Sequence, residues 1–227
     1  EIARRIIRTA KRLGVRTVAV YSEPDAQLPF VVEADQAVLI GPANPAQSYR
    51  DAQAILAAAK STGVQAVHPG YGFLSESADF ARAIEANGLV WVGPPADAIA
   101  AMGDKINARN LMAEAGLPIA PGWSAAPTSS LDSNDSSLDS NEVAAAAAEL
   151  GYPVMLKAAA GGGGMGMAVV TEEARLRGEY ERVCAFAKRM FGTGSVLLER
   201  YFPQVRHVEV QILGLADGRV LPLGERE

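Results

Sequence analysis

The sequence contains one cysteine, Cys184, and only two histidines among its 227 residues. A single cysteine excludes an internal disulfide framework, and two histidines argue against a metal centre built from several imidazoles. Basic charge is not in excess either: 21 Lys+Arg stand against 26 Asp+Glu, and a net charge of -5 gives no broad positive field for nucleic acid. No apolar run reaches the roughly 20 residues that span a bilayer. These absences predict a soluble, cytoplasmic protein without nucleic-acid or membrane partners.

What is present is ordinary globular material, with 49% hydrophobic and 21% charged residues, enough for a sizeable core. Residues 2–13 place apolar and basic side chains on opposite faces of a predicted helix. A transit peptide or a membrane-surface helix could show the same pattern. The buried strand predicted at 15–21, directly after Gly14, favours instead the start of a structural α/β unit.

Strand-like and helical segments alternate over the first part of the chain. We predict strands at 17–21, 37–40, 66–68 and 89–92, and helices at 45–61, 78–87 and 97–115. This alternation is typical of a parallel sheet with helices on both faces, in which ligands gather at the carboxyl ends of the strands. The last third reads as strand, glycine loop, strand, helix, strand, strand, an α+β order. The sequence therefore predicts an α/β domain over residues 1–95 and a second domain over 96–227.

A polar tandem repeat interrupts the second domain. Residues 129–135 read SSLDSND and residues 136–142 read SSLDSNE. A coiled coil is excluded because each repeat offers one leucine, and Ser, Asp and Asn favour turns over helix interiors. We predict a flexible surface insertion at 129–142, followed by a helix in the alanine run that ends at Gly151.

A glycine-rich loop follows the buried strand predicted at 154–157. Five glycines lie within six positions: Gly161, Gly162, Gly163, Gly164 and Gly166. A dinucleotide-binding motif would need a helix to begin here, whereas residues 167–171 resume as a strand, and a P-loop would need lysine where Met167 stands. A plain flexible turn remains an alternative. The glycine content favours a mobile hairpin whose backbone N–H groups close over phosphates.

Two lysines accompany this loop. Lys157 ends the strand before it, and Lys105 follows Met-Gly-Asp at the start of a predicted helix. A cation beside a phosphate-binding loop favours a phosphate contact, although Lys157 could instead be a surface lysine whose stem packs on apolar neighbours. A lysine at a helix N-terminus opposes the helix dipole unless an anion binds there.

Three further segments place polar side chains at strand ends. The VLLERY segment at 196–201 predicts a buried strand ending in a carboxylate, which could accept from an adenine amino group or form a salt-bridged edge. The RHVEVQ segment at 206–211 predicts a strand with His207, Glu209 and Gln211 on one face, either solvent-facing or on a cleft floor. A metal site is disfavoured there because His207 is the one strong nitrogen ligand. The loop HPGYGFLSE at 68–76 carries His68, for which a structural role is favoured over a catalytic one.

Together these segments resemble the biotin carboxylase component of biotin-dependent carboxylases, in the ATP-grasp superfamily. The resemblance covers the chain except for 129–142, and its most specific parts are HPGYGFLSE, MGDK at 102–105, KAAAGGGGMGM at 157–167 and LLERYF at 197–202. It implies a Rossmann-like parallel-sheet pre-ATP-grasp domain followed by a truncated α+β ATP-grasp domain, with the family's first strand and second half outside this sequence. Another ATP-grasp ligase, such as a carbamoyl phosphate synthetase module, and a non-catalytic nucleotide-binding module remain alternatives.

The resemblance also implies a chemistry and the residues that serve it. ATP with Mg²⁺ (or Mn²⁺) activates bicarbonate as carboxyphosphate, which carboxylates carrier-bound biotin for an acyl-CoA carboxylase, of acetyl- or propionyl-CoA type by family habit. By position, Lys105 and Lys157 contact the nucleotide phosphates, and Gly163 and Gly164 belong to a flap that closes over ATP. The implied base pocket consists of Glu199 and the Tyr201 backbone at the adenine, Arg200 and Phe202 along its walls, and His207 near the ribose.

Two departures limit what the resemblance implies here. Met165 stands where the family's flap usually carries Lys or Arg, so weaker electrostatic help for the phosphates is expected. The magnesium ligands and catalytic groups are expected beyond Glu227, so no catalytic residue or metal ligand is assigned and the 227 residues alone are expected to be inactive. The implied partners are a biotin carboxyl carrier domain or protein, a carboxyltransferase subunit and further copies of the full-length enzyme.

Overall fold

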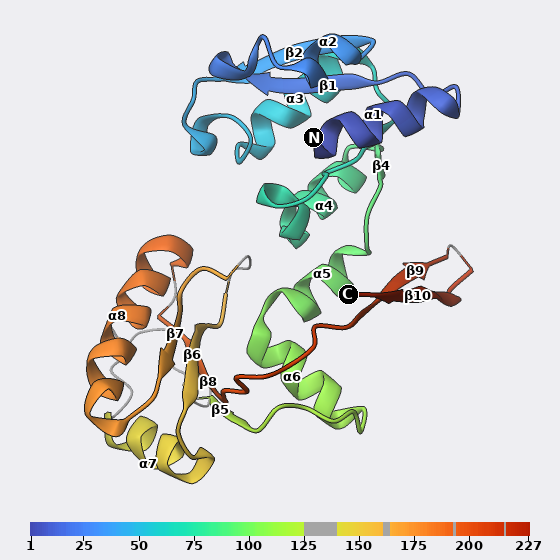
Figure 1. Cartoon of the computed structure of the whole chain (residues 1–227). Coiled ribbons are helices and arrows are strands. Elements are labelled where there is room, and N and C mark those ends of the chain that lie inside the picture. The colour runs from blue at the N-terminus through green and yellow to red at the C-terminus, as the bar shows by residue number, and fades with distance from the viewer. Residues whose placement is uncertain (125–139, 161–163, 193, 216) are drawn as a thin grey trace. The chain divides into compact units, whose positions relative to one another are not determined.

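The computed structural model describes residues 1–124, 140–160, 164–192, 194–215 and 217–227 (Figure 1). The chain divides into two compact units, Glu1–Ala100 and Ala101–Glu227, and the division falls within one helix. Most of the predicted polar insertion, 129–139, lies outside the described residues. In the described ranges, none of the helices has both the length and the apolar character that a bilayer crossing needs.

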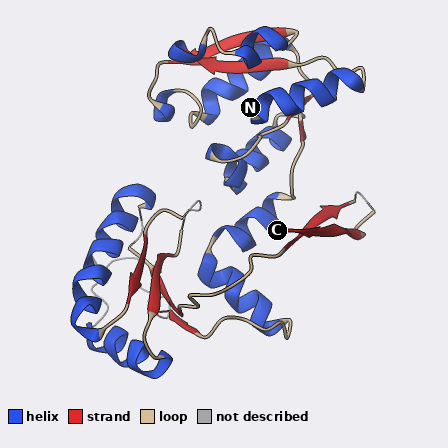
Figure 2. Ribbon diagram, in the orientation of Figure 1, coloured by secondary structure: helices blue, strands red, loops and turns tan. Residues whose placement is uncertain are grey.

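The first unit alternates helices with parallel strands (Figure 2). Strand β1 pairs in parallel with β2, and β3 pairs in parallel with β4, which confirms the predicted α/β class. The two pairs are separate sheets. Strands β3 and β4 are each two residues long, and prolines follow both of them, which limits how far their ladder can extend because proline offers no N–H. The elements are α1 (Ile2–Arg12), β1 (Val18–Ser22), α2 (Pro29–Glu33), β2 (Gln36–Gly41), α3 (Ala52–Thr62), β3 (Ala66–Val67), α4 (Ala78–Ala86), β4 (Val90–Trp91) and the start of α5 (Ala96–Gly103), with single 3₁₀ turns η1 (Glu23–Asp25), η2 (Pro45–Gln47) and η3 (Phe73–Glu76).

The helix predicted at 45–61 begins later than predicted, at the start of α3. Residues 45–47 form the 3₁₀ turn, and the α-helix begins only at Ala52, where the Asp51 side chain accepts hydrogen bonds from the backbone N–H groups of Gln53 and Ala54. A side-chain cap of this kind fixes where a helix starts, and apolar spacing alone does not show it. The helix ends at Gly63, whose φ of 65° is the left-handed conformation that glycine adopts most easily.

The first unit's core lies between α3, α4, β4 and α5. Leu56, Phe80, Ile84, Trp91 and Ile99 are its large buried members. The Phe80 and Trp91 rings meet edge to face with centroids 5.7 Å apart, and the Trp91 indole N–H donates to the Pro94 carbonyl at 3.0 Å. The apolar ring of the buried indole is therefore packed against Phe80, and its N–H group has a hydrogen-bond acceptor.

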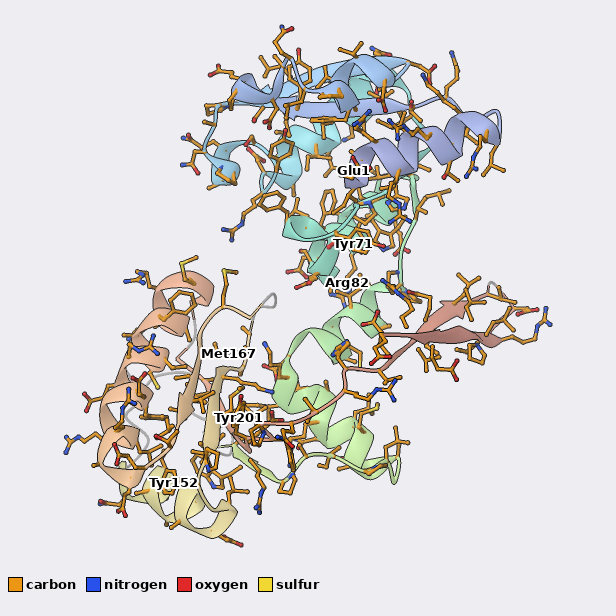
Figure 3. The ribbon with its side chains drawn as sticks, in the orientation of Figure 1. Glu1, Tyr71, Arg82, Tyr152, Met167 and Tyr201 are labelled. Carbon is orange, nitrogen blue, oxygen red and sulfur yellow. The ribbon has the colours of Figure 1, made fainter. Side chains whose placement is uncertain are left out.

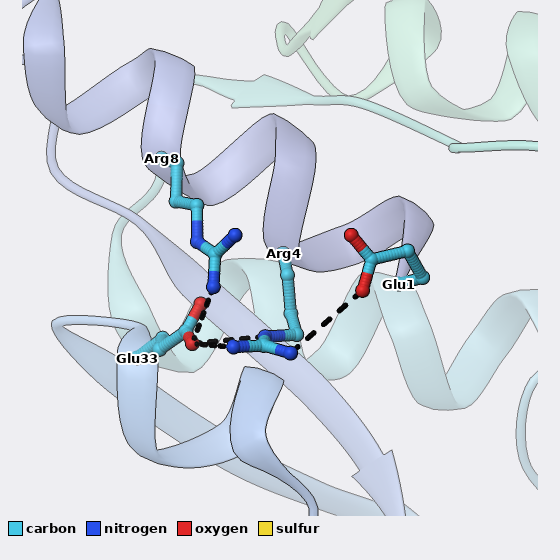
Figure 4. A network of polar contacts seen from close by, with 4 residues as sticks. All are labelled: Glu1, Arg4, Arg8 and Glu33. Atoms are coloured by element: carbon cyan, nitrogen blue, oxygen red, sulfur yellow. Dashed lines mark hydrogen bonds and ion pairs between the residues drawn. The ribbon is translucent and has the colours of Figure 1, made fainter.

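A cluster of charges joins α1 to α2 (Figure 4). Arg4 Nη2 lies 2.6 Å and Arg8 Nη2 lies 3.2 Å from the same oxygen, Glu33 Oε1. The hydrogen bond from Arg4, with help from Arg8, lowers the pKa of Glu33 to about 2. The basic face predicted for the first helix thus serves partly to hold the neighbouring helix.

The second unit is built on an antiparallel sheet in the order β5-β8-β6-β7, with a separate antiparallel hairpin of β9 and β10 (Figure 1). This is the predicted α+β arrangement. Both strands of the hairpin are exposed along their whole length. The elements are α6 (Lys105–Glu114), β5 (Gly122–Ser124), α7 (Ser140–Leu150), β6 (Val154–Ala158), β7 (Met167–Val170), α8 (Glu173–Phe191), β8 (Val196–Arg200), β9 (Glu209–Gly214) and β10 (Val220–Arg226).

The two faces of this sheet have different neighbours. Alternate residues of β6 (Val154, Leu156 and Ala158) are almost fully buried, and the first two belong to a core with α7 and α8. Because side chains alternate across a strand, Met155 and Lys157 lie on the other face. Helix α6 lies on that second side of the sheet, opposite α8 (Figure 1). One face therefore builds the core, and the other is left for a site.

Three predicted boundaries in this unit are wrong. The helix at 97–115 is two helices, because the Asp104 side chain caps a new helix by accepting from the N–H groups of Ile106 and Asn107. Helix α7 begins at Ser140, so 140–142 are helical rather than part of the insertion, since the alanine run and Glu142 in the first turn favour an earlier start. The strand at 206–211 begins at Glu209, where the ladder starts opposite Arg226.

Candidate functional site

An open hollow of about 340 Å³ lies on the second face of the sheet, beneath α6. Its polar lining is Lys105 and Arg109 from α6, Lys157 from β6 and Glu199 from β8. Apolar side chains supply the remaining walls: Met102, Ala108, Met112, Ile119, Ala120 and Leu197. A few convergent polar groups within an apolar wall are the usual composition of a small-ligand site.

Strand pairing brings Lys157 and Glu199 together. Glu199 pairs with Met155 and Leu197 pairs with Lys157, so the two charged side chains are diagonal neighbours on one face of the antiparallel β6–β8 pair. Lys157 Nζ lies 2.5 Å from Glu199 Oε2. Their side chains keep 27% and 15% of their exposed area, so the ion pair is largely shielded from water.

Helix α6 contributes the other two cations. Lys105 and Arg109 are four residues apart, which places both on one face of the helix. Arg109 Nη1 lies 3.5 Å from Glu199 Oε1, and the Arg109 side chain is 14% exposed. Lys105 Nζ donates to the Ala159 carbonyl at 3.5 Å, just beyond the end of β6.

The backbone at the start of α6 is engaged within the protein. Asp104 Oδ1 accepts from the N–H groups of Ile106 and Asn107, each at 2.9 Å, and the N–H of Lys105 donates to the Ala159 carbonyl at 3.1 Å. The first backbone N–H groups of α6 therefore all have hydrogen-bond acceptors within the protein. The negative charge of Asp104 also compensates for the unfavourable interaction of the Lys105 charge with the helix dipole. Any phosphate contact at this position belongs to the Lys105 side chain.

The charge of the hollow contrasts with that of the chain. The whole sequence carries a net charge of -5, yet the lining of the hollow holds three cations against one carboxylate. Such a surplus of positive charge in a partly desolvated site favours an anion, and lysine and arginine side chains suit phosphate oxygens. The residues present therefore fit a polyphosphate ligand.

The glycine-rich segment joins β6 to β7, which pair antiparallel with Lys157 opposite Met167. The predicted hairpin is confirmed. Gly163 lies outside the described residues, whereas Gly164 and Gly166 have φ of 78° and 67°. The Gly166 carbonyl accepts from the Ala158 N–H at 2.8 Å, which closes the base of the hairpin. Met165, the departure from the family's flap, is 52% exposed.

Besides Gly164, four described residues of the predicted site do not line the hollow. Arg200 donates to the Leu150 carbonyl at 3.4 Å, and the N–H of Tyr201, directly after β8 (Figure 3), donates to the Pro153 carbonyl at 3.0 Å. Phe202 is 45% exposed. The His207 side chain is 80% exposed, with Nε2 3.1 Å from Glu209 Oε2. The structure thus brings together Lys105, Lys157 and Glu199 and leaves these four outside their hollow.

Arg109 was missed by the sequence reasoning. Its one signal in the sequence is its spacing of four residues from Lys105 within a predicted helix. Because helical spacing does not say which face meets the sheet, the contact with Glu199 needed the structure.

Two further observations concern metals and His68. In the part of the chain that the structure describes, no group of three His, Cys, Asp or Glu side chains could hold a metal ion. His68 Nδ1 accepts from the Gly70 N–H at 3.0 Å, and burial lowers the pKa of His68. A neutral imidazole that accepts from its own loop holds the turn in place.

Comparison with protein families divides the chain in two. Residues 1–99 match the model described as biotin carboxylase, N-terminal domain. Residues 104–227 match the model described as carbamoyl-phosphate synthase L chain, ATP binding domain.

Individual relatives match along the entire chain. A biotin carboxylase of Pseudomonas aeruginosa is 46% identical over 229 residues, covering 100% of this chain and 49% of the relative. The mitochondrial methylcrotonoyl-CoA carboxylase subunit alpha of Arabidopsis thaliana is 44% identical, covering 100% of this chain and 30% of the relative. The chain therefore spans about half the length of the biotin carboxylase it matches.

Solved structures agree with these relatives. The biotin carboxylase domain of Hydrogenobacter thermophilus 2-oxoglutarate carboxylase, in complex with MgADP, ADP and bicarbonate, has a TM-score of 0.88 at 41% identity, covering 99% of this chain and 47% of that one. A biotin carboxylase–beta-gamma-ATP complex from Campylobacter jejuni also has a TM-score of 0.88, at 38% identity and with 99% and 48% coverage. This chain belongs to the biotin carboxylase family. The two domain matches, the identities along the whole of this chain and the shared fold together show it.

Proposed function

We propose that this chain supplies the nucleotide-binding part of an ATP-dependent biotin carboxylase. The observation that carries the proposal is the hollow in which Lys105, Arg109 and Lys157 surround one carboxylate at the base of the glycine-rich hairpin. A positive site next to a closable loop suits phosphoryl transfer, in which the protein's contribution is positioning and charge stabilisation.

In this proposal each residue has a defined task. Lys105 and Lys157 neutralise phosphate oxygens, and the hairpin that contains Gly163 and Gly164 covers the nucleotide and excludes water. Glu199 accepts a hydrogen bond from the adenine amino group. The Tyr201 backbone remains proposed to hold the adenine, Arg200 and Phe202 to line its pocket, and His207 to lie near the ribose. These roles would require the segment after β8 to close toward the hollow.

The whole enzyme's reaction is proposed to be carboxylation of biotin. Bicarbonate attacks the γ-phosphorus of ATP and releases ADP. The carboxyphosphate formed delivers its carboxyl group to a ureido nitrogen of biotin, which loses its proton, and inorganic phosphate is released. Mg²⁺, held by ligands outside the described residues, would neutralise the phosphate charge. Residues 1–95 are proposed as the pre-ATP-grasp domain and 96–227 as the front of the ATP-grasp domain.

The proposed partners are a biotin carrier and a carboxyltransferase. The final acceptor stays open between carboxylase types, because the relatives include propionyl-CoA carboxylase of Ruegeria pomeroyi and a putative urea carboxylase of Emericella nidulans beside the methylcrotonoyl-CoA enzyme. An acetyl- or propionyl-CoA carboxylase is one of these possibilities.

Isothermal titration of the natural full-length protein with Mg-ATP tests the nucleotide role. Lys157→Ala is expected to weaken ATP binding about 30- to 100-fold, because the phosphate then lacks one charge-assisted hydrogen bond in a shielded site. Lys60→Ala is the matched control, since Lys60 is an exposed lysine of α3 in the other unit. Equal ATP affinity and an equal ATP cleavage rate in wild type and Lys157→Ala would overturn the proposal.

A carbamoyl phosphate synthetase-like ligase is the second candidate, because the model that matches residues 104–227 bears that name. The match of residues 1–99 to a biotin carboxylase domain favours the first candidate. The two differ in their second substrate. Bicarbonate-dependent ATP cleavage that rises with free biotin supports the carboxylase, and cleavage that rises with an ammonia donor and ignores biotin supports the synthetase.

A further inference from the structure

The Glu199 carboxylate is shared between two cations from different elements. Lys157 Nζ, on β6, lies 2.5 Å from Oε2, and Arg109 Nη1, on α6, lies 3.5 Å from Oε1. Each carboxylate oxygen thus has its own positive partner. The three side chains are between 14% and 27% exposed, so water screens the cluster only partly.

The proposed function gives Lys157 a second task. A nucleotide phosphate carries more negative charge than one carboxylate and competes for the same ammonium group, which is a compact, mobile point charge. Once Lys157 turns to the phosphate, Oε2 of Glu199 loses its partner. The oxygen it frees is the acceptor that an adenine amino group requires.

Arg109 is suited to hold Glu199 through this exchange. Its planar guanidinium is more weakly hydrated than an ammonium, so it serves well in a shielded ion pair. Its helix is fixed to the sheet, because the Lys105 N–H donates to the Ala159 carbonyl at 3.1 Å one turn earlier. Arg109 therefore approaches Glu199 from a helix anchored at the end of the strand that carries Lys157.

We propose that Arg109 is a positioning residue for base recognition: it keeps the Glu199 carboxylate aimed at the adenine amino group while Lys157 engages the phosphates. This inference rests on the proposed nucleotide-binding function. It makes Arg109 a determinant of ATP over GTP, because guanine carries a carbonyl oxygen where adenine carries the amino group, and a carboxylate cannot accept a hydrogen bond from it.

The obvious rival is a direct role, in which Arg109 contacts the phosphates itself as the third cation of the hollow. The two roles differ in what they do to GTP. A phosphate contact is common to both nucleotides, so removing it weakens the binding of both by one factor. A positioning role through Glu199 affects only the nucleotide whose base Glu199 recognises.

The test measures ATP and GTP dissociation constants by titration calorimetry for wild type, Arg109→Met and Arg109→Lys in the natural full-length protein. Arg109→Met is expected to weaken ATP about tenfold, the loss of one hydrogen bond to a charged group, and GTP less than about twofold. Arg109→Lys keeps the charge and is expected to stay within about threefold of wild type for ATP. Arg175→Met is the matched control, since Arg175 is a 55% exposed arginine of α8, and neither nucleotide is expected to change.

A double-mutant cycle then connects the effect to Glu199. In a Glu199→Met background, Arg109→Met is expected to add less than about twofold to the loss of ATP affinity, because the acceptor of the hydrogen bond from adenine is already absent. Additive losses, or equal weakening of ATP and GTP, would overturn the positioning role, and so would an Arg109→Met variant that binds ATP like wild type. If Lys157→Ala still weakens ATP binding, the nucleotide-binding proposal stands even when the positioning role of Arg109 is overturned. If Lys157→Ala also binds ATP like wild type, both proposals are overturned.

Discussion

Glu33 in the first unit and Glu199 in the second are both carboxylates held by two cations. Both partners of Glu33, Arg4 and Arg8, come from one helix and reach one oxygen, and its other oxygen is buried without a hydrogen-bond partner. The partners of Glu199 come from two elements and reach separate oxygens. The first arrangement ties α1 to α2, and the second lines a hollow.

The difference teaches that an ion-pair cluster alone does not mark a site. Both clusters use the same chemistry, and the lowering of the pKa of Glu33 to about 2 reflects the close approach of Arg4, with a smaller contribution from Arg8. What distinguishes Glu199 is its place on the sheet face opposite the core, beside apolar walls and at the base of a glycine-rich hairpin. Accessible space with convergent charge is the functional indicator.

The largest expected effect on stability comes from removing the carboxylate of the hollow. Glu199→Ala leaves the Lys157 and Arg109 charges facing each other in a shielded space, which is expected to lower the free energy of unfolding by about 2 kcal/mol. Urea unfolding of the natural full-length protein, followed by Trp123 fluorescence in a Trp91→Phe background, reports on the second unit. Glu181→Ala removes an exposed carboxylate of α8 as the control, and a Glu199→Ala loss no larger than that control would contradict the prediction.

A carboxylate held by neutral donors gives an intermediate effect. In the first unit Asp25 Oδ2 accepts from Tyr49 Oη at 2.5 Å and from Ser22 Oγ at 2.7 Å, and these bonds lower the pKa of Asp25, the one from Tyr49 most. Tyr49→Phe keeps the ring stacked on Phe73 and is expected to cost about 1 kcal/mol. Urea unfolding followed by Trp91 in a Trp123→Phe background measures the loss. An unchanged midpoint would show that the hydroxyl bonds add nothing.

The smallest effect at neutral pH is expected from Glu33→Gln in the cluster that joins α1 to α2, and this effect should shrink as the pH falls. The pKa of Glu33 is lowered from 4.5 to about 2, so its contribution to stability is complete above pH 4.5 and is lost as the pH falls toward 2. Wild type should therefore lose more stability than Glu33→Gln across that window. Trp91 fluorescence during acid titration follows the first unit, and superimposable acid-unfolding curves would rule the prediction out.

Sequence reasoning succeeded where local chemistry determines structure. The α/β class, the β6–β7 hairpin and the lysines at 105 and 157 follow from strand and helix periodicity and from residues that stand at strand ends. The end of β8 was predicted at Glu199, and the family resemblance grouped this carboxylate with the two lysines. The hairpin and the element types depend on contacts between near neighbours in the chain or on the period of one element.

It failed where the answer depends on pairing between distant segments. Arg109 was missed because only the docking of α6 shows that its side chain reaches Glu199, 90 residues away. The hydrogen bond from the Tyr201 N–H to the Pro153 carbonyl was likewise not predicted. The separation of the first unit's strands into two pairs likewise follows from tertiary packing.

The glycine at the base of the hairpin restricts how this part of the sequence can change. A Cβ on Gly166 would lie 2.9 Å from a ring carbon of Phe186 on α8 and 3.1 Å from the Ala158 Cβ, and the backbone φ of 67° disfavours any side chain there. Trimming Phe186 would relieve the first obstacle and leave the second. No single compensating substitution therefore makes another residue acceptable at position 166. Sequence changes in α8 alone do not allow a side chain there.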